Sequence, residues 1–434
     1  MTVSSTLSPL VVRLVGPNPP LRLRFWDGST FGPHDAPATV VINSPNALRR
    51  LATAPGELGF GRAYVAGEID LEGDIFDALA IREHGVDLKA GPREWVEALR
   101  AARAVGALRA TPLPPPPEEA RLRGRRHSKQ RDAAAISHHY DVGDDFYRIV
   151  LGPSLTYSCA YFENPDSTLE DAQRDKHELI CRKLRLRADE RVLDVGCGWG
   201  SFLIHAASEH GVRGVGVTLS HQQAALASKR VAEAGLTDRI EIRLQDERDV
   251  SDGPYDAIAS VGMFEHVGTA RLHEYFTHLH ELLRPQGRVL NHGIARPPRP
   301  GADRPVETVR AAVTNRSRFA RRSFIDRYVF PDGEVHEIGD VVRAIERCDL
   351  EVRDVESLRE HYALTLRRWV DNLQRGRDAA VEAAGERRYR VWLLYMAASA
   401  RNFEAGRARI HQVLAVRADE GRSGVPLRRG DTVL

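Results

Sequence analysis

Residues 192–200, VLDVGCGWG, decide how this chain folds. A short apolar run that carries Asp194 leads directly into glycines at every second position, Gly196, Gly198 and Gly200. This order predicts the end of a buried strand, a tight turn and the start of a helix. The missing side chains would let a ligand approach the backbone of the turn closely.

Outward from the turn, short apolar runs alternate with amphipathic segments. We expect strands within 191–196, 212–220, 239–246 and 255–264, with helices between them. A further helix and then a strand are expected within 272–293. Strand and helix in alternation predict right-handed βαβ units, a mainly parallel sheet and therefore an α/β fold. The part after about residue 296 reads as mostly helical and arginine-rich, and we expect it to cover the carboxyl edge of the sheet.

The glycine turn is compatible with two kinds of cofactor, or with none. A nicotinamide site requires G-x-G-x-x-G and an acidic residue at the end of the second strand, whereas that strand here ends in VGVTLS at 215–220. The spacing from Asp194 to Gly200, D-x-G-x-G-x-G, is instead typical of class I methyltransferases that bind S-adenosylmethionine (SAM). The remaining alternative is a turn of purely structural use.

A proline-rich and basic stretch divides the chain. Five of the six residues 112–117 are proline, which predicts a stiff extended spacer, and a strongly basic stretch follows. Before it, apolar and charged residues alternate near 21–25 and 69–72, with an Asp27-Gly28 turn between them, which predicts a small α+β fold. We therefore expect an N-terminal accessory domain, a linker and a catalytic domain at 1–110, 111–131 and 132–434.

Composition excludes several classes of protein. The 62 Lys and Arg residues nearly balance the 60 Asp and Glu residues, so the net charge of +2 does not call for nucleic acid. The four cysteines form no C-x-x-C pair, so we expect neither a disulfide framework nor a metal site. No secretion signal and no run of about 18 apolar residues is evident, so we expect a cytoplasmic protein without a spanning segment.

Several segments together resemble one family, the cyclopropane-fatty-acyl-phospholipid synthases and their mycolic-acid and methyl-branching relatives. They include TYSCAYF, VLDVGCGWG, VGVTLSHQQ, SVGMFEHVG and EHYALTL, and the matching stretches run over 138–162, 192–200, 215–223, 243–250, 260–268, 282–297, 327–337 and 358–373. Residues 59–75, GFGRAYVAGEIDLEGDI, resemble the accessory domain of the phospholipid-acting members. The resemblance implies a class I SAM-dependent methyltransferase fold, Rossmann-like, with a small N-terminal α+β domain and helical insertions.

By this resemblance, contacts with SAM fall in four segments. The implied residues are Tyr157, Ser158, Asp194, Gly196, Gly198, Thr218, Leu219, Gln223 and Gly262. One position departs from the family pattern, because many relatives carry an aromatic residue where this chain has Glu247. The adenine contact expected at that position is therefore not carried over.

The resemblance also implies a catalytic cluster that binds bicarbonate, formed by Cys159, Glu265, His292, Tyr362 and the backbone of Ile294. Adding a methyl cation to an alkene leaves a carbocation, which must lose a proton to a weak base held away from water. A small anion held by a hydroxyl, an imidazole and a backbone amide supplies that base, and Glu265 can accept a hydrogen bond if the anion is protonated. His266 and His361 stand beside these residues as second choices.

The implied reaction is SAM-dependent C-methylation of the double bond of an oleoyl-type chain in a membrane phospholipid. Proton loss from the added methyl group closes a cyclopropane, whereas a hydride shift followed by proton loss leaves an exocyclic methylene, the precursor of 10-methylstearate. Residues 324–342, with Val335, His336 and Glu337, are similar to the methyl-branching actinobacterial members. This favours the methylene product, which a flavin- or NADPH-dependent reductase would reduce, and keeps the cyclopropane as the alternative.

Two more distant alternatives stay open, because a nucleotide-binding fold does not choose a substrate. One is a methyltransferase for a small amine, a hydroxyl or a sterol, and the other is a lipid-binding protein without catalysis. The oligomeric state, a homo-oligomer included, is not fixed by the sequence.

A phospholipid substrate requires access to a bilayer. Clustered arginines attract anionic headgroups, so we expect a peripheral enzyme on the inner face of the cell membrane. The candidate docking residues are Arg121, Arg123, Arg125, Arg126, Lys129 and Arg131. The simpler interpretation of this run is a solvated linker.

Overall fold

The computed structural model describes residues 2–15, 19–54, 56–80, 100, 103, 106, 112–122, 124–140, 142–298 and 323–427. The chain forms two compact units. The first comprises Met1–Arg121, Arg310–Pro331 and Ala380–Arg401, and the second comprises Leu122–Val309, Asp332–Ala379 and Asn402–Leu434. The boundary at residue 121 falls inside the expected linker, whereas 323–331 and 380–401, expected in the catalytic domain, fold with the first unit.

The first unit is a small mixed α and β structure. Its elements are α1 (Val3–Val15), β1 (Arg22–Phe25), β2 (Thr30–Phe31), β3 (Ala38–Ile42), α2 (Asn46–Thr53), α3 (Glu57–Val65), β4 (Ile69–Gly73), α4 (Ile75–Ala80) and α14 (Phe324–Tyr328). The strands pair in the order β2-β1-β3-β4, with β1 parallel to β3 and the other pairs antiparallel. Gly28 makes the β1–β2 turn with a φ of +80°, as the Asp27-Gly28 pair predicts.

The proline-rich segment is held against the first unit. The carbonyl of Pro114 accepts a hydrogen bond from Arg50 Nη1 at 2.9 Å. The buried carboxylate of Glu119 accepts two hydrogen bonds from Arg62, both at 2.8 Å. This bidentate pair fixes the end of the segment, in which Pro112, Pro114 and Pro117 are exposed and Pro116 is buried.

A helix from late in the chain completes the first unit. Helix α17 (Arg377–Ala384) is followed by α18 (Glu386–Glu404), which carries the buried Arg390. The Arg390 guanidinium donates to the carbonyls of Tyr64 at 2.6 Å and Ile69 at 2.7 Å. Its carbon lies 4.2 Å from the centre of the Tyr64 ring. Because a buried charge must be fully paired, these contacts fix α18 to this unit.

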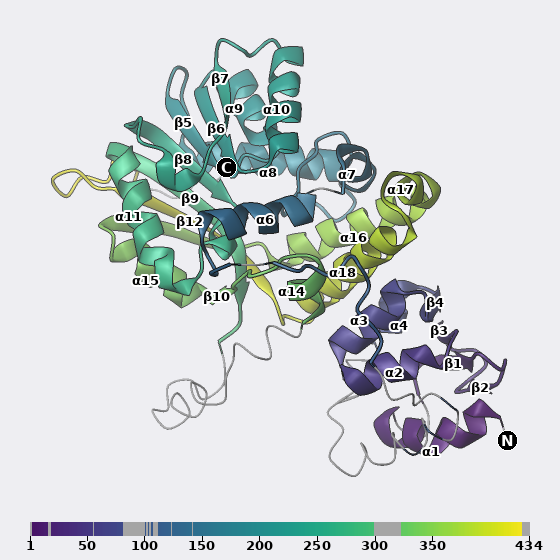
Figure 1. Cartoon of the computed structure of the whole chain (residues 1–434). Coiled ribbons are helices and arrows are strands. Elements are labelled where there is room, and N and C mark those ends of the chain that lie inside the picture. Colours follow the sequence, from purple (N-terminus) through teal and green to yellow (C-terminus); the bar gives the residue numbers. More distant parts are fainter. Residues whose placement is uncertain are drawn as a thin grey trace, which may run out of the picture. The chain divides into compact units, whose positions relative to one another are not determined.

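The second unit is built on an eight-stranded sheet (Figure 1). Its elements are α6 (Lys129–Tyr140), α7 (Asp144–Leu151), α8 (Leu169–Leu184), β5 (Arg191–Val195), α9 (Ser201–His210), β6 (Arg213–Thr218), α10 (His221–Glu233), β7 (Ile240–Leu244), η2 (Glu247–Asp249), β8 (Tyr255–Val261), η3 (Phe264–His266), η4 (Thr269–Arg271), α11 (Leu272–Leu282), β9 (Leu283–Arg296), β10 (His336–Glu337), α15 (Ile338–Glu346), β11 (Leu350–Ser357), α16 (Arg359–Arg375) and β12 (Arg409–Arg417). The order is β11-β12-β9-β8-β5-β6-β7, with β10 beside β9.

Helices cover both faces of this sheet. Side chains of α8, α9 and α10, such as Ile180, Leu203 and Val231, pack on one face. Side chains of α11 and α15, such as Phe276 and Ile345, pack on the other. Strands β5 to β9 are parallel, so their carboxyl ends meet at one edge. The predicted α/β fold with a mainly parallel sheet is confirmed.

The last part of the chain differs from its prediction. It contains helices, but β12 inserts antiparallel to β9 and β11 pairs antiparallel with β12. The expectation of a mostly helical region covering the sheet edge is therefore wrong for 350–357 and 409–417. Each of these strands contains a short run of apolar and β-branched residues. Periodicity alone does not distinguish such a run from part of a buried helix when the neighbouring strands are unknown.

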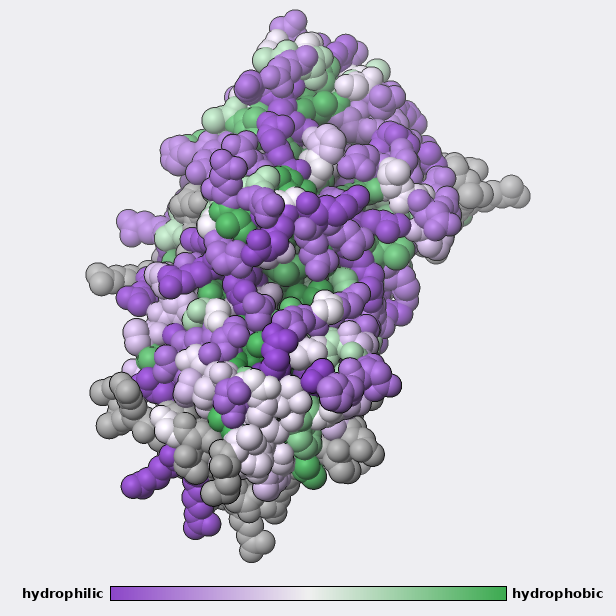
Figure 2. Space-filling model, turned by 90° about the vertical axis from the view of Figure 1, so that its right-hand side faces the viewer, coloured by the Kyte–Doolittle hydropathy of each residue, from purple (hydrophilic) through white to green (hydrophobic). Residues whose placement is uncertain are grey.

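Hydrophilic side chains cover most of the molecular face in Figure 2, and hydrophobic ones appear between them in small groups. Large exposed hydrophobic side chains are scattered, namely Val12, Leu244, Val335, Val355 and Leu427. Within the described ranges, every helix is too short or too polar to cross a bilayer.

Candidate functional site

The glycine turn joins β5 to α9 at the carboxyl edge of the sheet. Gly196, Gly198 and Gly200 have φ values of +77°, +55° and +77°, which residues with side chains rarely adopt. The amides of Gly196 and Cys197 both donate to the Val217 carbonyl at 3.0 Å, which ties the turn to β6. A Cβ at Gly198 would meet nothing within 4 Å, so open space lies against this backbone. The predicted strand, turn and helix are confirmed.

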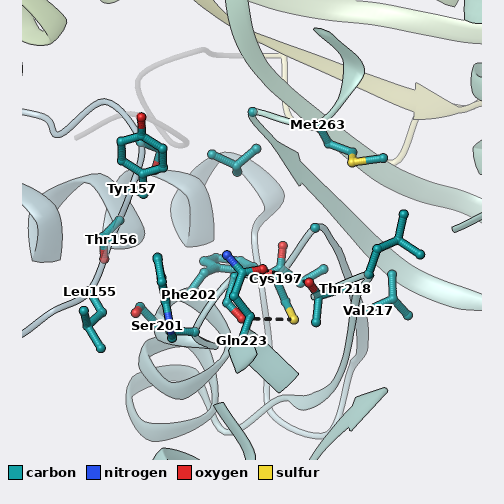
Figure 3. Close-up of a pocket in the computed structure, with 18 of the residues that line it drawn as sticks. Leu155, Thr156, Tyr157, Cys197, Ser201, Phe202, Val217, Thr218, Gln223 and Met263 are labelled. Carbon is teal, nitrogen blue, oxygen red and sulfur yellow. Dashed lines mark hydrogen bonds between the residues drawn. The ribbon is translucent and has the colours of Figure 1, made fainter. Parts of the chain in front are cut away.

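One pocket lies over this turn and collects every residue that the sequence predicts to contact the cofactor. Those residues are Tyr157, Ser158, Asp194, Gly196, Gly198, Thr218, Leu219, Gln223 and Gly262. In Figure 3, Thr218, Gln223 and Cys197 lie together, and Tyr157 and Met263 lie away from them. The fold brings the four segments together because three of them follow neighbouring parallel strands.

The strand ends around the pocket are fixed by local hydrogen bonds. Thr218 Oγ1 donates to Gln223 Oε1 at 2.8 Å and accepts from the Ser220 amide at 3.2 Å. Ser220 caps α10 by accepting a hydrogen bond from the Gln223 amide at 3.3 Å. After β8, Gly262 has a φ of +66° and its amide donates to the His292 carbonyl at 2.8 Å. The chain therefore holds these groups in place without help from a ligand.

Glu247 also lines the pocket, at the position where the family pattern has an aromatic residue. It begins the short helix η2 directly after β7, and its side chain is buried. Burial, together with the negative charge of Asp246, raises the pKa of Glu247 to about 7. A carboxyl group, not a ring, thus forms this part of the wall.

Helix α8 holds the loop that carries Tyr157 and Ser158. Gln173 Nε2 donates to the carbonyls of Thr156 at 3.2 Å and Ser158 at 3.0 Å. Lys176 Nζ donates to Ser158 Oγ at 3.0 Å. Both α8 side chains are buried, and the sequence analysis missed them because Lys and Gln on an amphipathic helix are usually solvated.

Lys176 places a buried ammonium group beside the pocket. Burial lowers its pKa to about 7, opposed by the neighbouring Cys159 and Asp194. Burial likewise raises the pKa of Asp194 to about 7, opposed by the charge of Lys176. The pKa of His292 is held well below its usual range, mainly by burial and then by Lys176. Lys176 therefore influences both the predicted cofactor contacts and the predicted catalytic cluster.

Glu265 and His292 carry buried polar atoms without a partner among the described residues. Glu265 Oε1 accepts a hydrogen bond from the Ile294 amide at 2.7 Å, whereas Oε2 has none. His292 Nδ1 lies 3.3 Å from Gln412 Nε2, and its Nε2 has no partner. Burial raises the pKa of Glu265 to about 7 and keeps His292 neutral. Buried polar atoms that lack a hydrogen-bond partner favour the binding of a polar ligand, because the ligand would supply the missing hydrogen bonds.

The other predicted members of the cluster are buried as well. The Cys159 thiol donates to the carbonyls of Ala160 at 3.2 Å and Leu358 at 3.7 Å, and burial raises its pKa. The thiol is therefore neutral and engaged with backbone. Tyr362 lies on α16, where its ring centre is 4.7 Å from that of Phe403.

The two second choices differ in their surroundings. His266 lines the pocket, and burial lowers its pKa to about 4. His361 Nδ1 accepts a hydrogen bond from the Phe162 amide at 3.0 Å, so it supports the loop backbone.

Aromatic rings surround the loop that carries Tyr157. The ring centre of Tyr157 lies 5.3 Å from that of Trp369 and 5.4 Å from that of His139. Tyr140 meets Trp199 of the glycine turn edge-on at 5.8 Å. Faces of such rings attract cations.

A pocket over a glycine turn at the carboxyl edge of a mostly parallel sheet is typical of enzymes that bind a nucleotide-containing cofactor, and comparison with solved structures gives the class of this one, the SAM-dependent methyltransferases. A solved structure of this class is similar, the mycolic acid cyclopropane synthase CmaA1 complexed with SAH and CTAB. It has a TM-score of 0.59 and 35% sequence identity, over 65% of this chain and 98% of that chain.

Sequence comparison gives the family. The mycolic acid cyclopropane synthetase family matches residues 127–413. A Mycobacterium tuberculosis protein named a probable fatty acid methyltransferase is 43% identical over 420 residues, 94% of each chain. The cyclopropane-fatty-acyl-phospholipid synthase of Escherichia coli K12 is 31% identical over 386 residues, 89% of each chain. The chain belongs to this family of SAM-dependent methyltransferases, as the resemblance implies.

Replacing Lys176 with methionine is expected to weaken SAM binding by up to about 10-fold, because the Ser158 loop would lose a buried hydrogen bond that contributes about 0.5–1.5 kcal/mol. Ser158 would lose the Nζ donor while the helix keeps a side chain of similar length. Calorimetric titration measures the affinity. Lys183→Met is the matched control, because Lys183 is equally buried but pairs with Glu356, outside the pocket. Unchanged affinity in Lys176→Met would contradict the assigned role.

Proposed function

We propose that the protein transfers the methyl group of SAM to the double bond of an unsaturated, oleoyl-type acyl chain in a membrane phospholipid. The observation that carries this proposal is that Glu265 and His292 are buried and that each keeps a polar atom without a partner among the described residues. Both are close to pocket-lining residues in the chain or the sheet, since Glu265 follows Met263 by two residues and His292 pairs with Val261 across β8 and β9. The names of the two curated relatives, a fatty acid methyltransferase and a phospholipid synthase, support a lipid substrate.

When bound, SAM supplies an electrophilic methyl group. Tyr157, Ser158, Thr218 and Gln223 would hold it over the glycine turn. Methyl transfer to an alkene leaves a positive charge on the acyl chain, and water must be kept from that charge. The aromatic faces around Tyr157 exclude water and attract a cation by about 0.5–2 kcal/mol each.

The proton that the methylated chain must lose requires a base. Gln412 presents its amide Nε2 to His292 Nδ1, so the imidazole carries its proton on Nε2 and can donate it to an anion. The Ile294 amide occupies Glu265 Oε1, which leaves Oε2 to accept a hydrogen bond from a protonated anion. We propose that these groups bind bicarbonate, which would supply a weak base in this buried site.

The proposed product is the exocyclic methylene, and a cyclopropane is the second candidate. The higher identity to the relative named a methyltransferase favours the first, and the identity to the relative named a cyclopropane synthase favours the second. His336 of the distinguishing segment is buried, and its ring centre lies 5.7 Å from that of Phe264, the neighbour of Glu265. His336 is thus placed to affect the position of the base relative to the carbocation. A methylene product would need a separate flavin- or NADPH-dependent reductase to become a methyl branch.

Proton NMR of the product lipid tests this proposal. Phospholipids from a host that expresses the protein without a reductase should show exocyclic vinylidene protons. Upfield ring protons without a vinylidene signal would overturn the methylene and establish the cyclopropane. Lipids without either signal would contradict methylation of the double bond.

Access to the bilayer is proposed to be peripheral, on the cytoplasmic face, with the first unit as the lipid-associated accessory domain. Arg121 and Arg125 are exposed. Arg126 and Arg131 pair with Asp332, and Lys129 pairs with Asp249, so these three are partly neutralised. Arg123, also predicted to dock, lies outside the described residues.

Replacing Arg121 and Arg125 with glutamine is expected to weaken association with anionic liposomes at low salt by about 10-fold or more, because each charge near the surface contributes about 1 kcal/mol. Co-sedimentation with phosphatidylglycerol vesicles measures the effect. The matched control removes two exposed arginines elsewhere, Arg347 and Arg422, and should bind as the unchanged protein does. Equal partitioning of both variants would support the solvated-linker interpretation.

A further inference from the structure

Three side chains with metal-binding atoms converge on α8 and α9, outside the cofactor pocket. The ligand atoms of Cys181, His205 and His210 all lie within 4.8 Å of one another. Glu178 Oε2 lies beside the two histidines, 2.9 Å from His210 Nε2 and 3.3 Å from His205 Nε2, but is not within 4.8 Å of all three ligand atoms. We call Cys181, His205 and His210 the α8–α9 cluster.

The helices place these side chains by simple geometry. Glu178 and Cys181 are three residues apart on α8 and therefore share one face. His205 lies within α9 and His210 ends it, just before Gly211 closes the helix with a φ of +67°. The two helices pack together on one face of the sheet. Two faces that approach each other thus contribute one donor from α8 and two from α9.

The spacing suits a tetrahedral ion. For metal–nitrogen bonds of about 2.05 Å, neighbouring ligand atoms in a tetrahedron are about 3.3 Å apart. The ligand atoms of Cys181, His205 and His210 lie within 4.8 Å of one another, so small rotamer adjustments would bring them to this spacing around one ion.

We propose that the α8–α9 cluster binds a divalent transition metal ion, with Zn²⁺ the best match to one Cys and two His, and with a fourth position left for solvent. On binding, a metal–sulfur bond forms and the Cys181 thiol releases its proton to solvent. One thiolate and two neutral imidazoles leave the bound ion with one net positive charge, which the adjacent Glu178 carboxylate balances.

The surroundings agree with a metal centre. Cys181 is fully buried, whereas the side chains of His205 and His210 keep exposures of 13% and 21%, which gives an ion a route from solvent. Arg182 Nε donates to the other carboxylate oxygen, Glu178 Oε1, at 2.9 Å and so orients the carboxylate that lies beside both histidines.

A bound ion would join two helices that serve the catalytic site. Helix α8 carries Gln173 and Lys176, which hold the Ser158 loop, and α9 starts at the glycine turn. The ion is thus a structural clamp behind the pocket and takes no part in methyl transfer.

Cobalt titration of the purified, chelator-treated full-length protein tests the site. Tetrahedral Co²⁺ bound to a thiolate gives intense visible bands and a near-ultraviolet charge-transfer band. We expect both at one equivalent, their loss on adding Zn²⁺, and a higher unfolding temperature with Zn²⁺. Absence of these bands, or the weak bands of octahedral Co²⁺, would overturn the proposal and leave Glu178 as the acceptor of a histidine hydrogen-bond network.

Variants make the test specific. Cys181→Ser should remove the charge-transfer band, and His210→Gln, at a partly exposed position where folding is not at risk, should weaken Co²⁺ binding about 10-fold or more. Cys348→Ser is the matched control, because Cys348 Sγ contacts a histidine, His273 Nδ1, at 3.1 Å but belongs to no cluster of three donors within the described chain. Bands that persist in Cys181→Ser and His210→Gln, or that vanish in Cys348→Ser, would overturn the assignment.

Discussion

Replacing Glu265 with glutamine is expected to lower turnover by about 10²- to 10⁴-fold, the usual contribution of a positioned acid–base group. The new side chain would have to keep its amide oxygen on the Ile294 N–H, which Glu265 Oε1 occupies at 2.7 Å. Its NH₂ group would then take the place of Oε2 and could only donate. A protonated anion would lose its acceptor, while the cofactor contacts stay unchanged, so the affinity for SAM should remain within about 2-fold of the original value.

The pH profile adds a second readout. Burial raises the pKa of Glu265 to about 7, and the account requires the ionised form. Turnover should therefore fall as the pH drops below about 7, and this decline should be smaller in the residual activity of Glu265→Gln, in which Asp194, Glu247 and Lys176, whose pKa values are also about 7, still titrate. Tyr362→Phe should also lower turnover more than affinity.

Glu334→Gln is the matched control for the carboxyl change. Glu334 accepts hydrogen bonds from Thr269 and does not line the pocket, although its amide donates to the Glu265 carbonyl at 2.9 Å. Its turnover should match that of the unchanged protein. Wild-type rates in both Glu265→Gln and Tyr362→Phe would move the proton-accepting cluster elsewhere.

Replacing Gly196 with valine is expected to abolish SAM binding. A Cβ at this position would point at Met263, 3.5 Å from its Sδ, and the two methyl groups of valine would extend into the pocket. The φ of +77° adds strain of about 1–3 kcal/mol for a residue with a side chain. Calorimetry should detect no binding, while circular dichroism retains the native spectrum.

The variant Gly235→Val distinguishes occlusion of the cofactor pocket from backbone strain as the cause of lost SAM binding. Gly235 has a similar φ of +70°, but a Cβ there meets nothing within 4 Å and the residue lies outside the pocket. This variant should lose comparable stability and bind SAM normally. Retained binding in Gly196→Val would refute the cofactor assignment, and equal loss in both variants would attribute the effect to strain alone.

The predictable part of the site is the part that depends on short stretches of sequence. Asp194, Thr218 and Gly262 lie at the carboxyl ends of the neighbouring parallel strands β5, β6 and β8, so correct prediction of the strands places them at one edge of the sheet. The positions of Glu265 and His292 are predictable for the same reason, since Val261, near Glu265 in the chain, pairs with His292 across β8 and β9.

The unpredicted part depends on contacts between distant segments. Nothing local marks Lys176 as buried, because its burial depends on Ser158 and Asp194. Likewise Arg390 joins the first unit through the carbonyls of Tyr64 and Ile69, more than 300 residues earlier. The cysteine spacing gave no sign of the α8–α9 cluster, because its donors come from two helices and only one of them is a cysteine.

The central claim is that the chain carbon of a lipid double bond receives the methyl group and that this group then loses a proton. The most direct test incubates the purified protein with SAM that carries a trideuterated methyl group and with vesicles of dioleoyl phospholipid. Mass spectrometry of the released acyl chains should show one added carbon that keeps two of the three deuterium atoms, for the methylene and the cyclopropane alike. An added group that keeps all three, a label found only in the headgroup, or acyl chains without label would contradict the account.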